Sequence, residues 1–215
     1  MANVEIQKNQ TELSFVILAG GKSSRMGFDK CLLSFLGIPL IERIIDIVDP
    51  ISNELFIVAN DAKLNYLNLR IVNDNIAGLG ALGGLYTALL EAKNEFVSVV
   101  GCDLPFISKD IILEAYRIIQ RTQADVVIPK TSQGYFEPLH AIYRRDTCKE
   151  AILTAISKGE RRLISWFSAV KVVEMDNVLC ESLDPEGIAF LNINTQADYN
   201  FAEEIANKKL NKTAP

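Results

Sequence analysis

The strongest structural signal in the chain is the stretch FVILAGGKSSRMGFDKCLLSFLGIPLIERII, residues 15–45. It begins with a short, continuously apolar run, passes through a turn rich in glycine and basic residues, and ends in apolar residues at three- and four-residue spacing. Continuous apolar character is typical of a strand buried on both faces, and the later spacing is typical of an amphipathic helix. We therefore expect a strand, a ligand-binding loop and a helix in this order.

The same alternation of short apolar runs and helical patterns continues along the chain. Strands are predicted at Ser14–Leu18, Leu55–Ala59, Leu69–Val72, Phe96–Val100 and Asp125–Ile128. Helices are predicted at Pro39–Val48, Leu82–Ala92, Lys109–Arg121, Asp146–Lys158 and Thr195–Asn207, with Ser108 and Thr195 as N-caps. This pattern predicts an α/β fold with a mostly parallel sheet and helices on both faces.

The pattern weakens at TSQGYFEPLHAIYRRD, residues 131–146. We expect a loop there that leads into an edge strand, which need not be parallel to the others. A single domain is expected over residues 13–207, between a flexible N-terminal arm, residues 1–12, and a flexible C-terminal tail, residues 208–215.

Charge and composition exclude several classes of protein. The net charge of -5 argues against a general nucleic-acid binder, which would carry a basic stripe. No secretory signal and no run of membrane-spanning length is present, so we expect a cytoplasmic protein without membrane contact. The four cysteines lie far apart and form no CxxC pair, so neither a zinc site nor a disulfide framework is expected.

The first candidate site is the loop LAGGKSSRMGFDK, from Leu18 to Lys30. Gly20 and Gly21 permit a close approach of backbone N–H groups to a ligand, and Arg25 and Lys30 add positive charge. This combination is suited to phosphate groups, although the spacing matches neither a Walker A loop nor a Rossmann fingerprint. The alternative is a surface loop whose basic residues are merely solvated.

The second candidate is the GxGxxG pattern formed by Gly78, Gly80 and Gly83 ahead of a helix. It permits a dinucleotide site, with Asp103 as the acid that binds the ribose. A glycine-rich helix entry, selected for close packing, explains the pattern equally well.

The third candidate is Asp103, which follows the apolar run FVSVV. At the carboxyl end of a strand it would face the basic loop and could bind a Mg²⁺ ion that bridges a triphosphate. The alternative is an aspartate that only starts a turn before Pro105.

Weaker signals come from the second half of the chain. His140, the only histidine, is expected to be a hydrogen-bonded structural residue more readily than a catalyst. Arg161 and Arg162 either bind an anion or face solvent. Asn192 and Asn194 alternate along an extended run and are expected on the same side of it, where both amides could reach a ligand.

Taken together, LAGGKSSRMGFDK, ND with GLGALGGL, CDLPFI, GERR and NINT resemble the signature motifs of the molybdenum cofactor guanylyltransferase family. The resemblance extends over nearly the whole chain. It implies a Rossmann-like fold and the transfer of GMP from Mg²⁺-bound GTP to molybdopterin or Mo-molybdopterin. Pyrophosphate would be released and the guanine dinucleotide cofactor formed. Proteins that deliver or accept the cofactor would be further partners.

The resemblance also implies roles for individual residues. Arg25, Lys30 and Asp103 would be catalytic, with Asp103 as the magnesium ligand, and Asn192 and Asn194 would bind the acceptor. The nucleotide would contact Leu18, Ala19, Gly20, Gly21, Lys30, Asn60, Asp74, Gly78, Gly83 and Asp103.

Other functions stay open from the residues alone. Within the same chemistry, the chain could be a cytidylyltransferase or act on a sugar phosphate. A NAD(P)-dependent oxidoreductase would use the GxGxxG pattern, but the basic first loop would then have no role. A nucleotide-binding regulator would bind GTP without releasing pyrophosphate.

Overall fold

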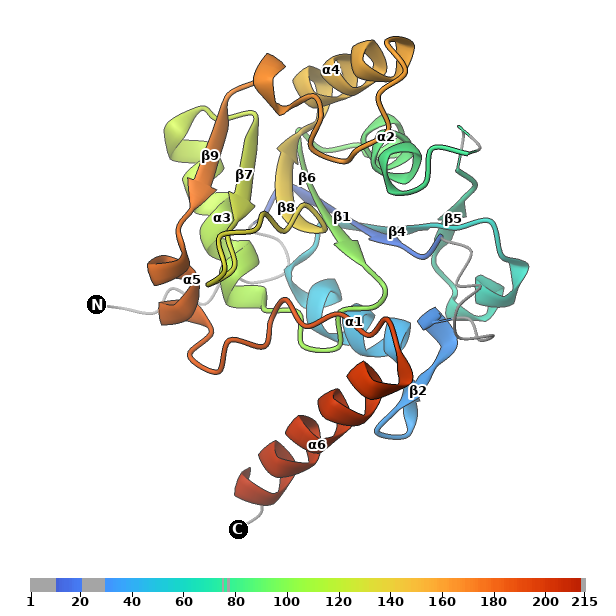
Figure 1. The fold of residues 1–215 in the computed structure, drawn as a ribbon. Coiled ribbons are helices and arrows are strands. Elements are labelled where there is room, and N and C mark those ends of the chain that lie inside the picture. Colours follow the sequence, from blue (N-terminus) through green and yellow to red (C-terminus); the bar gives the residue numbers. More distant parts are fainter. Residues whose placement is uncertain (1–10, 21–29, 75, 77, 214–215) are drawn as a thin grey trace.

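The computed structural model describes residues 11–20, 30–74, 76 and 78–213 of the chain. Its centre is a seven-stranded sheet in the order β5-β4-β1-β6-β8-β7-β9 (Figure 1). Neighbouring strands are parallel except at β8, which is antiparallel to both β6 and β7. The strands of this sheet are β1 (Leu13–Leu18), β4 (Glu54–Val58), β5 (Arg70–Val72), β6 (Phe96–Gly101), β7 (Val126–Pro129), β8 (His140–Arg144) and β9 (Val172–Met175).

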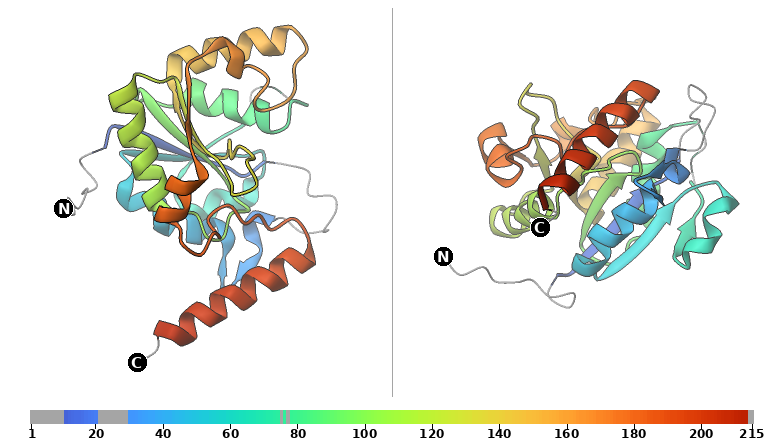
Figure 2. Two further views of the ribbon diagram at one scale, coloured as in Figure 1. Left: turned by 60° about the vertical axis from the view of Figure 1, so that its left-hand side comes forward. Right: turned by 90° about the horizontal axis from the view of Figure 1, so that it is seen from below.

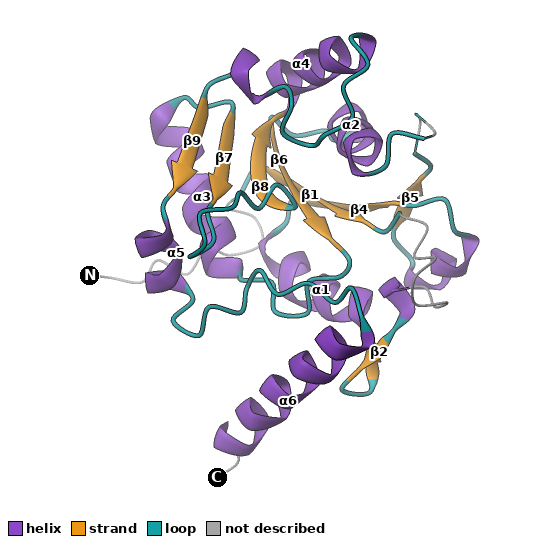
Figure 3. Ribbon diagram, in the orientation of Figure 1, coloured by secondary structure: helices purple, strands orange, loops and turns teal. Residues whose placement is uncertain are grey.

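Helices cover both faces of the sheet (Figures 1 and 3). One face packs against α1 and α3 and the other against α2 and α4. The α-helices are α1 (Leu40–Val48), α2 (Ala81–Glu91), α3 (Lys109–Thr122), α4 (Arg145–Ser157), α5 (Asn177–Leu183) and α6 (Gln196–Thr213). The predicted mostly parallel α/β fold is confirmed, and none of the helices among the described residues is long and apolar enough to span a bilayer.

The two-sided cover explains why β1 is apolar throughout. Phe15 and Ile17 belong to the core cluster under α1 and α3, whereas Val16 and Leu18 belong to the cluster under α2. Successive side chains of a strand point to opposite faces, so a strand covered on both sides needs apolar residues at every position. All six residues of β1 are buried.

Helix starts follow the predicted capping residues. The backbone N–H of Ile111 donates to Ser108 Oγ at 3.3 Å, at the start of α3. At the start of α6, the N–H of Asp198 donates to Thr195 Oγ1 at 3.1 Å, and the Asp198 carboxylate accepts from the Thr195 N–H at 2.8 Å. This reciprocal pair is a capping box, which satisfies donors that the helix leaves unpaired.

The expectation of an edge strand after TSQGYFEP was wrong. β8 lies inside the sheet between β6 and β7, and His140, Ala141, Ile142 and Tyr143 are all buried. Its antiparallel direction, which the sequence left open, results from a short connection that returns the chain beside β6. The edge strand on this side of the sheet is β9, which the pattern did not predict.

A small hairpin of β2 (Ser34–Phe35) and β3 (Ile38–Pro39) was also not predicted. Its turn contains Leu36 and Gly37, both with positive φ, as tight two-residue hairpins require. Phe35 and Leu40 pack with Ile193 and Ala202 in a small third core cluster, which fastens α6 to the domain. Figure 2 shows α6 running outward from the sheet.

The chain ends differ in part from the expected boundaries. The last two residues of the predicted N-terminal arm are bound to the domain, since Thr11 Oγ1 donates to the Ile51 carbonyl at 2.7 Å and the Glu12 N–H donates to Tyr116 Oη at 3.1 Å. Residues 1–10 lie outside the described residues. At the other end, α6 continues to Thr213, so most of the predicted tail is helical.

Candidate active site

Three neighbouring parallel strands, β4, β1 and β6, end at the same edge of the sheet. Leu18 ends β1, Asn60 follows β4, and Asp103 follows β6. The ladder continues past the strand ends, because the Ala19 N–H donates to the Val58 carbonyl at 2.9 Å and the Cys102 N–H donates to the Leu18 carbonyl at 3.2 Å. Strands in a ladder lie about 4.8 Å apart, so the structure brings these predicted site residues to one edge.

Lys30, Asp103 and Asn194 form a polar cluster at this edge. Lys30, in a 3-10 turn (Lys30–Leu32), donates from Nζ to Asn194 Oδ1 at 2.7 Å and lies 3.7 Å from Asp103 Oδ2. The Ile193 N–H donates to the Asp103 carbonyl at 2.9 Å, which ties the NINT segment to the end of β6. Residues from three distant parts of the sequence therefore meet as the motifs predicted.

Burial and charge shape the acidity of this cluster. Burial raises the pKa of Asp103, and the positive charge of Lys30 opposes that shift in part. The side chains of Lys30 and Asp103 are 20% and 25% exposed, so the ion pair is accessible to a ligand. Further positive charge nearby would stabilise the ionised form of a buried carboxylate that has only one partly exposed cation beside it.

Glu137 is a second carboxylate near the cluster that the sequence analysis did not single out. Burial and the negative charge of Asp103 raise the pKa of Glu137 to about 7. The β6–β8 register pairs Val100 with His140, and a Cβ placed on Gly101 would lie 3.5 Å from Leu139 Cδ1. Glu137 lies ahead of β8, where its N–H donates to the Pro129 carbonyl at 3.0 Å and its carbonyl accepts from the His140 N–H at 3.1 Å. The signal was the run EPLHAIY, whose position beside the end of β6 only the fold reveals.

Asn60 and Asp74 organise the glycine-rich segment before α2. The Asp74 N–H donates to Asn60 Oδ1 at 2.9 Å, and Asp74 Oδ1 accepts from the Ile76 N–H at 3.0 Å and from Thr87 Oγ1 at 3.3 Å. A Cβ on Gly83 would lie 2.9 Å from the Ile76 carbonyl and 3.2 Å from both Asp74 carboxylate oxygens. Gly83 is therefore needed so that this loop can lie directly on the first turn of α2.

The other glycines of the GxGxxG pattern have backbone roles. Gly78 and Gly80 have positive φ, which favours glycine. Arg161 Nη1 donates to the Gly78 carbonyl at 3.2 Å, so the GERR segment holds this loop from the side of α4. Leu18 contacts both the helix α2 and the end of β6. Its side chain lies 3.3 Å from the position that a Cβ on Gly84 would take, and its carbonyl accepts from the Cys102 N–H.

Some predicted residues do not join the cluster. Asn192 donates from Nδ2 to the Phe190 carbonyl at 3.3 Å, whereas Asn194 bonds to Lys30. His140 is 1% exposed, with Nε2 3.4 Å from the Ser108 carbonyl and its ring against Phe190. It is a buried structural residue. Gly21 and Arg25 lie outside the described residues.

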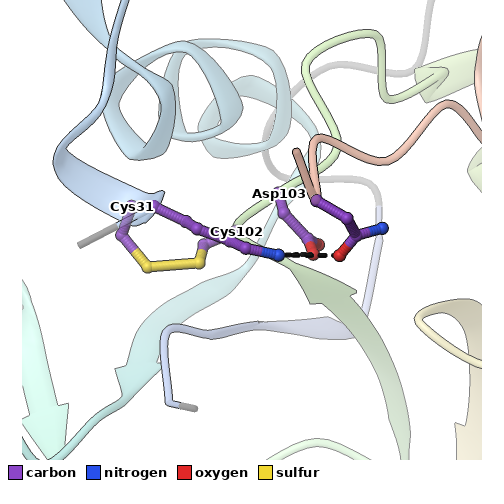
Figure 4. The surroundings of a disulfide bond; sticks show 5 residues. Cys31, Cys102 and Asp103 are labelled. Atoms are coloured by element: carbon purple, nitrogen blue, oxygen red, sulfur yellow. Dashed lines mark hydrogen bonds and ion pairs between the residues drawn. A yellow bond between two sulfur atoms is a disulfide. The ribbon is translucent and has the colours of Figure 1, made fainter. Parts of the chain in front are cut away.

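The sequence analysis expected no disulfide framework, and it missed one disulfide that the structure contains. Cys31 and Cys102 are disulfide-bonded with a Cα–Cα distance of 5.3 Å (Figure 4). They are separated by 71 positions in the sequence, and only the fold brings the turn Lys30–Leu32 beside the end of β6. Cys148 and Cys180 are free, buried thiols. The sequence did hold a signal for this pair. Cys31 follows Lys30 and Cys102 precedes Asp103, two residues that were expected to face each other.

The donor set at this edge fits a hard divalent cation. Asp103 offers carboxylate oxygens and Asn194 offers an amide oxygen, and both face the same lysine. Mg²⁺ is commonly held by one or two carboxylates together with substrate phosphates. Among the described residues, no group of three or more histidine, cysteine or acidic residues suited to a metal occurs.

Comparison with known proteins places the chain in a family. The model of the MobA-like NTP transferase domain matches residues 15–173. The chain belongs to this family. A protein from Natranaerobius thermophilus named as a probable molybdenum cofactor guanylyltransferase is 35% identical over 206 residues, covering 94% of this chain and 98% of the relative. The molybdenum cofactor guanylyltransferase of Desulfosudis oleivorans is 31% identical, over 87% of this chain and 93% of that protein.

A solved structure agrees with these relatives. The crystal structure of molybdopterin-guanine dinucleotide biosynthesis protein A from Archaeoglobus fulgidus superposes with a TM-score of 0.79 at 28% identity, covering 91% of this chain and 99% of that chain. The resemblance inferred from the motifs is therefore confirmed, and the chain is a nucleotidyltransferase by family. Membership of this family favours nucleotidyl transfer over the oxidoreductase interpretation of the GxGxxG pattern.

Proposed function

We propose that this protein transfers GMP from GTP to molybdopterin or Mo-molybdopterin, releasing pyrophosphate and forming the guanine dinucleotide cofactor. The observation that carries the proposal is the cluster of Lys30, Asp103 and Asn194 at the carboxyl ends of β1 and β6. In open α/β sheets, ligands bind at this edge. The names of the relatives support the choice of substrates.

The chemistry needs little proton transfer from the protein. A phosphate oxygen of the acceptor attacks the α-phosphorus of GTP, the new P–O bond forms, and the bond to pyrophosphate breaks. A phosphate monoester is already an anion near neutral pH. The protein therefore contributes position and charge neutralisation. Lys30 would neutralise phosphate charge, and the backbone of the loop after β1, with Arg25, would hold the leaving pyrophosphate.

Asp103 and Asn194 would hold Mg²⁺, which when bound neutralises phosphate charge and polarises the phosphoryl group. The raised pKa of Asp103 fits this role, because burial disfavours its ionised form and an added cation would stabilise that form. Asn194, together with Asn192, would also bind the acceptor.

The nucleoside would lie toward α2. The Asp74 carboxylate is engaged by Ile76 and Thr87, so its role is to shape the loop from Asp74 to Gly83. Backbone groups of this loop and Asn60 would then contact the base and ribose. We place the reaction in the cytoplasm, where proteins that deliver or accept the cofactor would meet this site.

The decisive experiment is pyrophosphate release with Mg²⁺ and either GTP or CTP, each with molybdopterin, with a sugar phosphate, and without an acceptor. Release with GTP that depends on molybdopterin is the expected result. Release with CTP instead would assign a cytidylyltransferase. Release only with a sugar phosphate would assign a different acceptor. Mg²⁺-dependent GTP binding without any release would favour a nucleotide-binding regulator.

Variants test the roles of the two charged residues. Asp103→Ala and Lys30→Ala should each lower kcat by at least about a hundredfold, the order of effect of a lost transition-state contact. Asp110→Ala, an exposed residue in the first turn of α3, is the matched control and should retain activity. Unchanged turnover in a folded Asp103 or Lys30 variant would remove that residue from the mechanism.

A further inference from the structure

The disulfide lies at the centre of the proposed active site. Cys31 is bonded in sequence to Lys30 and Cys102 to Asp103, so the Sγ–Sγ bond joins the two backbones that carry the proposed catalytic charges (Figure 4). The structure describes one disulfide, and it occurs at this position. The two free cysteines lie elsewhere, Cys148 on α4 and Cys180 on α5.

Noncovalent contacts between the two segments are weak by comparison. The Lys30–Asp103 ion pair spans 3.7 Å between partly exposed groups, and pairs of that kind contribute little to stability. A second noncovalent link runs through residues 193–194, because the Ile193 N–H donates to the Asp103 carbonyl at 2.9 Å and Asn194 accepts from Lys30 at 2.7 Å. A single hydrogen bond contributes only about 1 kcal/mol, so the covalent bond is the strongest restraint on the separation of the two functional groups.

We propose that the Cys31–Cys102 pair is a redox-sensitive positioning element of the active site. In the disulfide form it holds Lys30 and Asp103 at the spacing that the transfer reaction needs, and its reduction lowers turnover. This inference rests on the proposed function. A displacement of about 1 Å at a catalytic group can lower the rate by as much as a hundredfold, so a small relaxation of the segment 30–32 suffices.

The redox step is a thiol–disulfide exchange with a dithiol reductant. A thiolate of the dithiol attacks one sulfur, the Sγ–Sγ bond breaks, and a mixed disulfide forms. The second thiolate of the dithiol then resolves it. Two electrons and two protons pass to Cys31 and Cys102, and the dithiol becomes a cyclic disulfide. In a reducing compartment, disulfides are usually transient or redox-sensing, which fits a reversible pair.

The test compares the two redox forms of the full chain. The protein is equilibrated with oxidised or reduced dithiothreitol, free thiols are alkylated, and peptide mass spectrometry assigns the state of each cysteine. Pyrophosphate release and calorimetric binding of Mg²⁺–GTP are then measured for both forms, well below the melting temperature of the reduced protein. Cys31→Ser and Cys102→Ser represent the permanently open pair, and Cys148→Ala is the control cysteine variant.

The reduced wild type should show a kcat ten- to a hundredfold below that of the oxidised form, with KM and the Kd for Mg²⁺–GTP changed by less than about threefold. Both serine variants should show the low kcat in either buffer, whereas Cys148→Ala should keep the redox response. A general structural defect would instead change KM and Kd together with kcat.

Two results would overturn the proposal while leaving the proposed function intact. These are equal kcat in the two redox forms of the wild type, and the absence of a Cys31–Cys102 bond from the oxidised protein that nevertheless releases pyrophosphate. Failure of the oxidised wild type to release pyrophosphate from GTP would instead reject the proposed function, and this inference with it.

Discussion

At the scale of single residues, two titratable side chains near the start of β8 behave oppositely. Glu137 has a raised pKa because burial and the charge of Asp103 disfavour its ionised form. His140 has a lowered pKa because burial disfavours the imidazolium. Both shifts make the free energy of unfolding depend on pH, with opposite signs.

Glu137→Gln should stabilise the protein at alkaline pH. The folded-state pKa of about 7 lies above the ordinary value of 4.5, so the favourable contribution of the protonated form is complete below 4.5 and is lost as pH rises through 7. At pH 8 in EDTA, the variant should gain about 1 kcal/mol over wild type, a figure discounted for the partly exposed side chain. Urea unfolding at pH 5 and pH 8 measures this difference, with the exposed Glu181→Gln as control. A gain that is equal at the two pH values would contradict the explanation.

His140 should destabilise the protein under mild acid. Its pKa falls from 6.5 to about 4 on folding, so the unfolded state binds more protons between these values and stability decreases as pH falls through this window. At pH 4.5 the loss relative to pH 8 should be about 2–3 kcal/mol. Denaturant unfolding of wild type and His140→Gln across this range isolates the contribution. An unchanged pH dependence in a folded variant would assign the acid sensitivity to other groups.

At the scale of elements, the start of α6 links helix capping to the site. The Asp198 carboxylate accepts from the Asn194 N–H at 2.9 Å and from the Thr195 N–H at 2.8 Å. The first of these bonds is the main cause of the lowered pKa of Asp198. The capping box therefore also orients the backbone of Asn194, whose side chain bonds to Lys30.

Asp198→Ala should thus affect both stability and catalysis. Loss of a capping group costs about 1 kcal/mol, which guanidinium unfolding would detect. If Asn194 serves the acceptor, the KM for molybdopterin should rise severalfold while the KM for GTP changes little. Glu204→Ala is the control, because Glu204 pairs with Lys208 on an exposed face of the same helix. If stability falls while both KM values stay unchanged, the capping box stabilises α6 but does not position the acceptor site.

At the scale of the whole molecule, the disulfide closes a large loop of the chain. Its cysteines are 71 positions apart, and a cross-link of this length restricts the unfolded chain by about 4 kcal/mol in the chain-entropy model. Reduction of the wild type should lower the free energy of unfolding by that order. Urea unfolding with and without dithiothreitol measures it, and Cys31→Ala/Cys102→Ala should show no response to the reductant. An equal response in this double variant would assign the effect to other groups.

The described strands and helices show where sequence patterns suffice. The five predicted strands and five predicted helices all formed near their expected positions, because a strand or helix covered on one or both faces must carry the matching apolar period. The structure also brings Lys30, Asp103 and Asn194 together, as expected for residues at strand ends and loops of one sheet edge, while their roles stay predictions.

Contacts between distant segments required the tertiary structure. The interior position of β8 and the approach of Glu137 to Asp103 depend on the antiparallel return of one strand. The Cys31–Cys102 bond depends on the turn Lys30–Leu32 lying beside the end of β6. Local patterns record which face of an element is buried, but they do not record which element lies beside it. The amino-acid sequence alone was therefore sufficient for the fold class and the family, and it predicted charged residues that meet at one sheet edge, whereas the contacts that set their acidity and spacing exist only in the folded chain.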